Sequence, residues 1–128
     1  MSGILIETIA LPNGLTLEVW DYSRSIAADT DKVELQVRAS IAIDPAFFTD
    51  EEQHRTVRRH FGDTLLFAYR NERTFVARGE RENVFRQFVD TFCKDTMPYL
   101  SKPDFPRRFA LSKYLDIQKN PFKYGRTP

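Results

Sequence analysis

The stretch from Val33 to Ile43 alternates between apolar and polar side chains. A period of two residues indicates a β-strand with one dry face and one wet face. A single wet face also favours an antiparallel sheet, because parallel strands are usually buried on both sides. The apolar set is Val33, Leu35, Val37, Ala39, Ile41 and Ile43, and the polar set is Lys32, Glu34, Gln36, Arg38 and Ser40, with only the small Ala42 breaking the polar row.

Before this strand, the sequence predicts a hairpin formed by residues 3–11 and 15–23. Asn13-Gly14 lies between two apolar runs, and both of these residue types accept a positive φ, as tight hairpin turns require. A two-residue loop places Leu11 opposite Thr16 and Glu7 opposite Trp20. In this register one face of the hairpin is rich in large apolar side chains and lies away from Val19. Its members are Leu5, Ile9, Leu11, Trp20 and Tyr22.

After the strand, residues 49–62 predict a short amphipathic helix. Thr49 has the character of an N-cap residue, and Glu52 completes a capping box with it. Gly62 is placed as the C-terminal stop. The narrow stripe of His54, Val57 and Phe61 is expected to face inward.

A second hairpin is predicted from residues 64–70 and 74–78. A two-residue loop at Asn71 and Glu72 mixes polar and apolar residues on each face. A three-residue loop, Asn71 to Arg73, separates them, and register follows the cleaner pattern. We therefore expect the three-residue loop.

Two helices are expected to follow, at residues 81–99 and from about Pro106 to Lys119. The first has the broad apolar face of an amphipathic helix, made of Val84, Phe85, Phe88, Val89 and Phe92. We expect this face to lie on the apolar side of the strand at residues 33–43, with Phe88 buried.

Together these elements predict an α+β fold. It consists of a five-stranded antiparallel sheet (hairpin, long third strand, helix, second hairpin) with the C-terminal helices packed on it. The 128 residues suggest one domain of ordinary size. We expect that domain to cover residues 1–119 and residues 120–128 to form a flexible tail.

Several classes of protein do not fit this sequence. The five glycines are too scattered for a dinucleotide or phosphate-binding loop, and we expect no cofactor. His54 and His60 are six residues apart and face different sides of a helix, so we expect no metal site. Cys93 is the single cysteine. With no signal peptide and no apolar run of about 18 residues, we expect a soluble, cytoplasmic protein without a membrane partner.

The charges are unevenly divided along the chain. Residues 1–52 carry 3 basic and 10 acidic side chains, and residues 53–128 carry 16 and 8. The two halves could face each other in the fold or across a dimer, or the basic half could meet an acidic partner.

From these features we predict a non-catalytic protein-binding or self-assembly module. The expected partner-binding residues are Leu5, Ile9, Trp20 and Tyr22, and the expected assembly is a homodimer whose interface includes Trp20. One alternative is a nucleic-acid-binding domain with a basic face, and another is an enzyme with an unrecognised site. The basic face consists of Arg55, Arg58, Arg59, Arg70 and Arg78.

Overall fold

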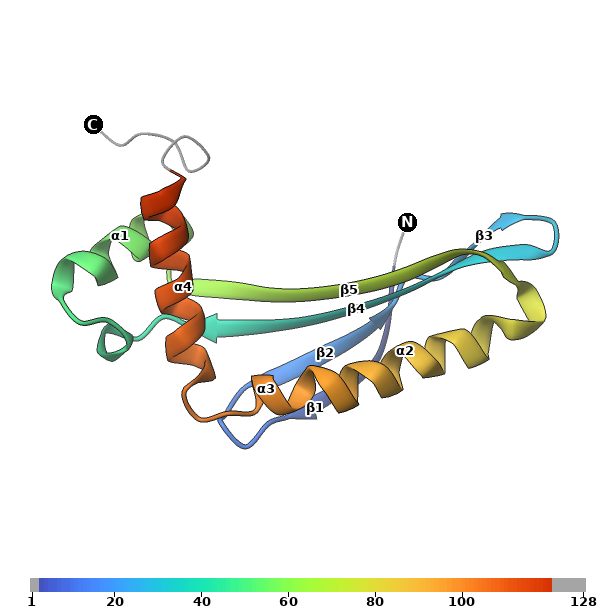
Figure 1. The fold of residues 1–128 in the computed structure, drawn as a ribbon, viewed down its shortest axis with the longest axis horizontal. Coiled ribbons are helices and arrows are strands. Elements are labelled where there is room, and N and C mark those ends of the chain that lie inside the picture. Colours follow the sequence, from blue (N-terminus) through green and yellow to red (C-terminus); the bar gives the residue numbers. More distant parts are fainter. Residues whose placement is uncertain (1–2, 121–128) are drawn as a thin grey trace. The chain divides into compact units, whose positions relative to one another are not determined.

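A computed structural model describes residues 3–120 and confirms the predicted α+β fold with a five-stranded antiparallel sheet (Figure 1). Its residue contacts form two compact units. Unit 1 contains residues 3–39 and 67–102, and unit 2 contains residues 40–66 and 103–120. The single domain expected over residues 1–119 stays a prediction. The expected tail lies outside the described residues, apart from Asn120.

The sheet has β4 at its centre. β2 pairs with β4, with Val19 opposite Val37, and β3 continues along the same edge, with Arg24 opposite Lys32. β1 pairs with β2, and β5 pairs with β4. The strands are β1 (Ile4–Ala10), β2 (Thr16–Asp21), β3 (Arg24–Ala27), β4 (Thr30–Ala42) and β5 (Thr64–Ala77).

β4 confirms the strand predicted from alternation. Its apolar members are all at most 3% exposed, namely Val33, Leu35, Val37, Ala39 and Ile41. The strand begins earlier than expected, at Thr30, and ends at Ala42. Alternation was reliable here because β4 has neighbouring strands along both edges, which fix the direction of each side chain.

The turn between β1 and β2 differs from the predicted two-residue loop. The N–H of Leu11 donates to the C=O of Leu15 at 2.8 Å, and the N–H of Gly14 donates to the C=O of Leu11 at 3.1 Å. The loop therefore has three residues, with Gly14 in the left-handed region (φ 92°). The predicted register was wrong by one residue: Glu7 lies opposite Val19, and Ile9 lies opposite Leu17.

Asn13 explains why the shorter loop was the wrong choice. Its side-chain oxygen accepts the N–H of Leu15 at 3.2 Å, and its amide nitrogen donates to the carbonyls of Leu100 and Lys102 at 2.7 and 2.9 Å. The asparagine therefore ties the turn to the C-terminal part of unit 1. Only Gly14 supplies the positive φ that the turn needs.

The predicted second hairpin was also wrong, because residues 64–77 form one strand, β5. The segment expected to turn contains no glycine or proline, and β4 is long enough to pair with an extended neighbour. The irregularity lies later, at Phe75, which has φ 57° and is 82% exposed. Because Arg73 lies over the ring of Phe88 and Val76 is buried, the alternation of β5 shifts across Phe75.

The helices of unit 1 follow β5. They are the 3₁₀ turn η2 (Arg78–Glu80), α2 (Arg81–Asp95) and α3 (Met97–Leu100). The single helix expected over residues 81–99 is interrupted at Thr96, just before the proline in the first turn of α3. α2 lies against one face of the sheet of this unit (Figure 1). Its buried residues are Val84, Phe88 and Phe92, and the Phe92 ring lies 4.9 Å from that of Tyr69. The predicted burial of Phe88 is confirmed.

Unit 2 contains the ends of β4 and β5, the 3₁₀ turn η1 (Pro45–Phe47), α1 (Glu51–Phe61) and α4 (Phe105–Lys119). The cap of α1 is shifted by one residue from the prediction, because Asp50, not Thr49, accepts the N–H of Gln53. Gly62 ends the helix with φ 80°. Val57 is buried, and α4 packs against α1 and η1.

Candidate functional site

β1 is an edge strand with an unusual amount of exposed apolar surface. Within residues 3–120 it pairs with β2 alone. Ile4, Leu5 and Ile6 are 65%, 45% and 49% exposed. Edge strands are commonly protected by Lys, Pro, a bulge, an inward-pointing charge or a covering element. β1 contains neither Lys nor Pro, and no strand among residues 3–120 pairs with its outer edge.

A bulge in β1 changes the direction of its side chains. Leu5 lies opposite Trp20, whereas Glu7 lies opposite Val19, so Ile6 is the extra residue. Val19 is buried on the α2 side of the sheet, and Glu7 consequently points to that side as well. Bulges often redirect a side chain at the edge of a sheet.

A groove lies between this part of β1 and the first turns of α2. Its cavity has a volume of about 350 Å³. Apolar and charged side chains from the strand and the helix line it together. The lining residues are Ile6, Glu7, Asp21, Arg81, Glu82, Phe85, Arg86 and Val89.

The charged side chains that line the groove differ in whether they form hydrogen bonds or ion pairs within the protein. Arg81 donates to Asp31 at 3.1 Å and to the carbonyl of Ser23 at 3.0 Å. Glu7, Glu82 and Arg86 form no hydrogen bond or ion pair with any of residues 3–120. The groove thus offers two uncommitted carboxylates against one uncommitted guanidinium.

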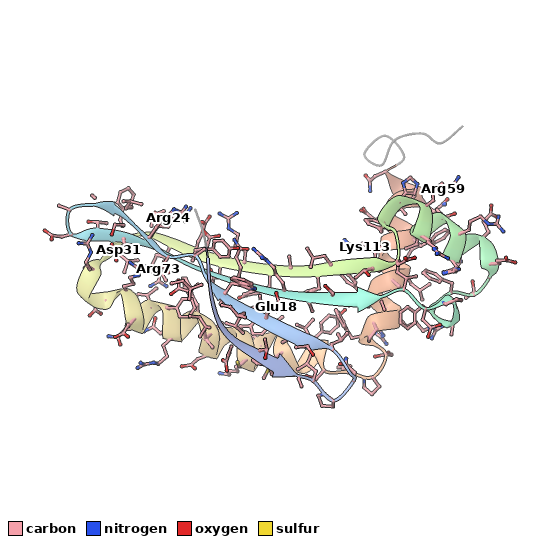
Figure 2. The ribbon with its side chains drawn as sticks, turned by 180° about the vertical axis from the view of Figure 1, so that it is seen from behind. Glu18, Arg24, Asp31, Arg59, Arg73 and Lys113 are labelled. Carbon is pink, nitrogen blue, oxygen red and sulfur yellow. The ribbon has the colours of Figure 1, made fainter. Side chains whose placement is uncertain are left out.

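Asp31 anchors the helical side of unit 1 at the end where α2 begins (Figure 2). It is fully buried and also accepts a hydrogen bond from Arg78 at 3.2 Å. Burial alone would raise the pKa of Asp31, but the hydrogen bonds from Arg81 and Arg78 lower it below its ordinary value. Because Arg78 and Arg81 also bind Ser25 and Ser23, the cluster joins α2 to the β3–β4 region.

The predicted partner-binding residues do not share one face. Leu5 lies opposite Trp20, a pairing that the predicted register did not give, but both lie on the side away from Val19, which is the face expected for them. Ile9 lies opposite the buried Leu17, so its assignment to the Trp20 face was wrong. Leu11 is buried.

Trp20 and Tyr22 are half-buried beneath a shared cation. The guanidinium of Arg38 lies 5.3 Å from the Trp20 ring and 5.2 Å from the Tyr22 ring, and it donates to the Tyr22 hydroxyl at 2.6 Å. Trp20 Nε1 donates to Glu18 at 3.0 Å. The backbone of Gly3 passes so close to Tyr22 that an added Cβ would lie 2.5 Å from the ring. The homodimer through Trp20 stays a prediction.

A network of charges continues across this wet face of the sheet. Glu34, only 4% exposed, contacts Arg24 and Arg70, both at 3.1 Å. Glu72 bridges Arg70 and Lys32 at 2.8 and 2.7 Å. Burial would raise the pKa of Glu34, but hydrogen bonds from Gln36 and Arg24 and the charge of Arg70 lower it. These charges are paired with one another and cover the face of the sheet.

The arginines predicted to form a basic face lie on different elements. Arg70 belongs to the network on the wet face, whereas Arg78 binds Asp31 on the α2 side. Arg55, Arg58 and Arg59 lie on α1 in unit 2. Arg58 pairs there with Asp63 at 3.0 Å, and Arg55 lies 3.9 Å from Glu51. Only the α1 arginines share one element.

The remaining candidate groups are Cys93 and the possible metal ligands. Burial, together with the charges of Glu7 and Asp90, raises the pKa of Cys93, so the thiol is held in its protonated form. Among residues 3–120, no group of three His, Cys, Asp or Glu side chains is arranged to hold a metal ion. No helix in the same part of the chain has the length and apolar character needed to cross a membrane.

Sequence reasoning missed Glu7 and the buried Asp31. Glu7 was assigned to the opposite face because the turn register was wrong by one residue. The signal for Asp31 was its position two residues before Val33, which places it on the apolar side of the same strand. A comparison of the chain with protein-family models, curated proteins and solved structures found no match.

Proposed function

We propose that this protein is a non-catalytic binding module that accepts an extended segment of another polypeptide as an additional strand along β1. The observation that carries the proposal is the open edge of β1, with Ile4, Leu5 and Ile6 exposed beside a groove. Strand addition is a common mode of peptide recognition, in which main-chain hydrogen bonds supply affinity and pockets beside the strand supply specificity.

The backbone of β1 identifies the groups available to such a segment. The hydrogen bond between Leu11 and Leu15 marks a hydrogen-bonded pair, and these pairs alternate along an antiparallel ladder. Ile9 therefore points its backbone groups toward β2. The N–H and C=O groups of Thr8 and Ala10 point outward, toward an added strand.

Thr8 provides a sharp test of the proposal. Random nine-residue peptides displayed on phage would be selected on the full chain, and the selected peptides would be titrated against two variants. Thr8→Pro removes an outward N–H without removing a bond to β2, whereas Thr8→Ala keeps that N–H. We expect Thr8→Pro to weaken binding by about tenfold and Thr8→Ala to leave it nearly unchanged.

Two results would contradict the proposal. One is a selection that enriches no peptide, and the other is a set of peptides that bind the Thr8→Pro variant as tightly as the original chain. Self-assembly is the other form of module predicted from the sequence. Sedimentation of the full chain at micromolar concentration tests it, with a 15.0 kDa monomer as the result that removes the homodimer.

A further inference from the structure

Glu7 occupies an unusual position for a charged residue. It lies in an edge strand, yet its side chain is on the same side of the sheet as the buried Val19. Its charge contributes to the raised pKa of Cys93 on α2, which supports this direction. The carboxylate remains exposed because the outer edge of β1 has no neighbour among residues 3–120.

A strand added along β1 would change the surroundings of this carboxylate. Glu7 and the added residue opposite it would form a non-hydrogen-bonded pair, in which side chains approach most closely. An apolar residue there would cover the carboxylate and remove it from water without a partner, which is unfavourable. A Lys or Arg would instead form a cross-strand ion pair.

The other charges of the groove do not satisfy Glu7. Arg81 is held by Asp31 and Ser23. Arg86 lies four residues after Glu82 on α2 and forms no ion pair with Glu7. Asp21, at the strand side of the groove, adds a second negative charge. The charged side chains that the strands contribute to the groove are therefore acidic, and Ile6, Phe85 and Val89 supply its apolar lining.

We infer that Glu7 is a specificity-determining residue that selects segments with a basic side chain between two apolar ones, in the pattern apolar-x-basic-x-apolar. This inference rests on the proposed strand addition to β1. The basic side chain pairs with Glu7. The apolar side chains lie on the same face as the basic one, beside Ile9 at one end of the segment and beside the groove-lining residues Phe85 and Val89 at the other.

Two capped peptides that differ at one position test the inference: TVTKTVT and TVTETVT. Fluorescence anisotropy with the full chain is expected to show about fivefold tighter binding of the lysine peptide, from one attractive and one repulsive cross-strand pair. In Glu7→Lys the preference is expected to reverse. Asp95→Lys makes the same change in net charge at an exposed position outside the groove, and it is expected to keep the original preference.

The outcomes separate this inference from the proposed function. Equal affinity for the two peptides, with both lost in Thr8→Pro, would overturn the role of Glu7 and leave strand addition intact. A lysine preference that persists in Glu7→Lys would also overturn it. If neither peptide binds the original chain, the inference fails, and the phage selection then decides the proposed function independently.

Discussion

The central strand β4 and the edge strand β1 are both rich in apolar residues, yet these residues are buried in β4 and largely exposed in β1. Val33, Leu35 and Val37 in β4 are completely buried, whereas Ile4 and Ile6 in β1 are 65% and 49% exposed. Within the part of the chain that the structure describes, β4 has strands along both edges, and β1 has one along a single edge. The difference shows that apolar side chains of an edge strand can remain exposed where those of a central strand are buried.

Edge position also permits irregular backbone. β1 accommodates a bulge at Ile6, and β5, which pairs with β4 alone within residues 3–120, contains Phe75 at φ 57°. A bulge or a positive φ in β4 would disturb two ladders at once. The open edge of β1 is therefore compatible with a binding role, and the regular β4 with a role in stability.

The largest expected effect is at α2, which lies against one face of the sheet of unit 1. Phe88→Ala should destabilise the protein by about 3–5 kcal/mol, because it removes a buried aromatic side chain and leaves a cavity. Phe75→Ala is the matched control, since Phe75 is 82% exposed, and it should cost less than about 1 kcal/mol. Urea unfolding measures both, and equal losses would contradict the comparison.

The next largest effect should be a loss of stability at acidic pH. The folded-state pKa values of Asp31 and Glu34 are lowered, so below about pH 5 the unfolded state binds more protons than the folded state. Their stabilising contribution is complete above the unfolded pKa values and is lost as pH falls through the folded ones. The urea midpoint should therefore decline between about pH 5 and pH 3.

A variant measures how much Glu34, on the wet face of the sheet, contributes to this loss of stability in acid. Glu34→Gln should show a smaller decline of the urea midpoint over the same range, because it lacks one carboxylate whose pKa is lowered. Asp95→Asn, at an exposed position on α2, serves as the control and should follow the original chain. If Glu34→Gln declines as steeply as the control, the ion pairs of Glu34 do not contribute.

A matched pair of isoleucines sharpens the comparison of the two strands. Ile41→Val in β4 removes a methyl group from a side chain that is 1% exposed and should cost about 1 kcal/mol. Ile4→Val in β1 removes the same group from a side chain that is 65% exposed, and the free energy of unfolding should change by less than about 0.5 kcal/mol. Similar costs would mean that β1 is covered in solution.

The smallest effect should be a gain in stability at the irregular position of β5. Phe75→Asn replaces an exposed residue held at positive φ by one that accepts this conformation more readily. The free energy of unfolding should rise by less than about 1 kcal/mol. A clear loss of stability would show that the Phe75 ring makes stabilising contacts in solution.

The sequence by itself determined the α+β class, the strand β4, and the approximate extents of α1, α2 and α4. Each of these depends on periodicity or on local stop signals, which residues close together in the chain supply. The burial of Phe88 followed from the same periodicity, because a helix with one broad apolar face has to place that face on the dry side of a sheet.

Only the tertiary structure decided the register of the first hairpin, the continuity of β5 and the direction of Glu7. Asn13 bonds to carbonyls almost ninety positions away in the sequence, and this distant contact selects a three-residue turn over the two-residue turn that local propensity favours. A change of one residue in register moves a side chain to the other face of a strand. The direction of the Glu7 carboxylate toward the groove therefore could not be predicted without the contacts between Asn13 and residues 100 and 102.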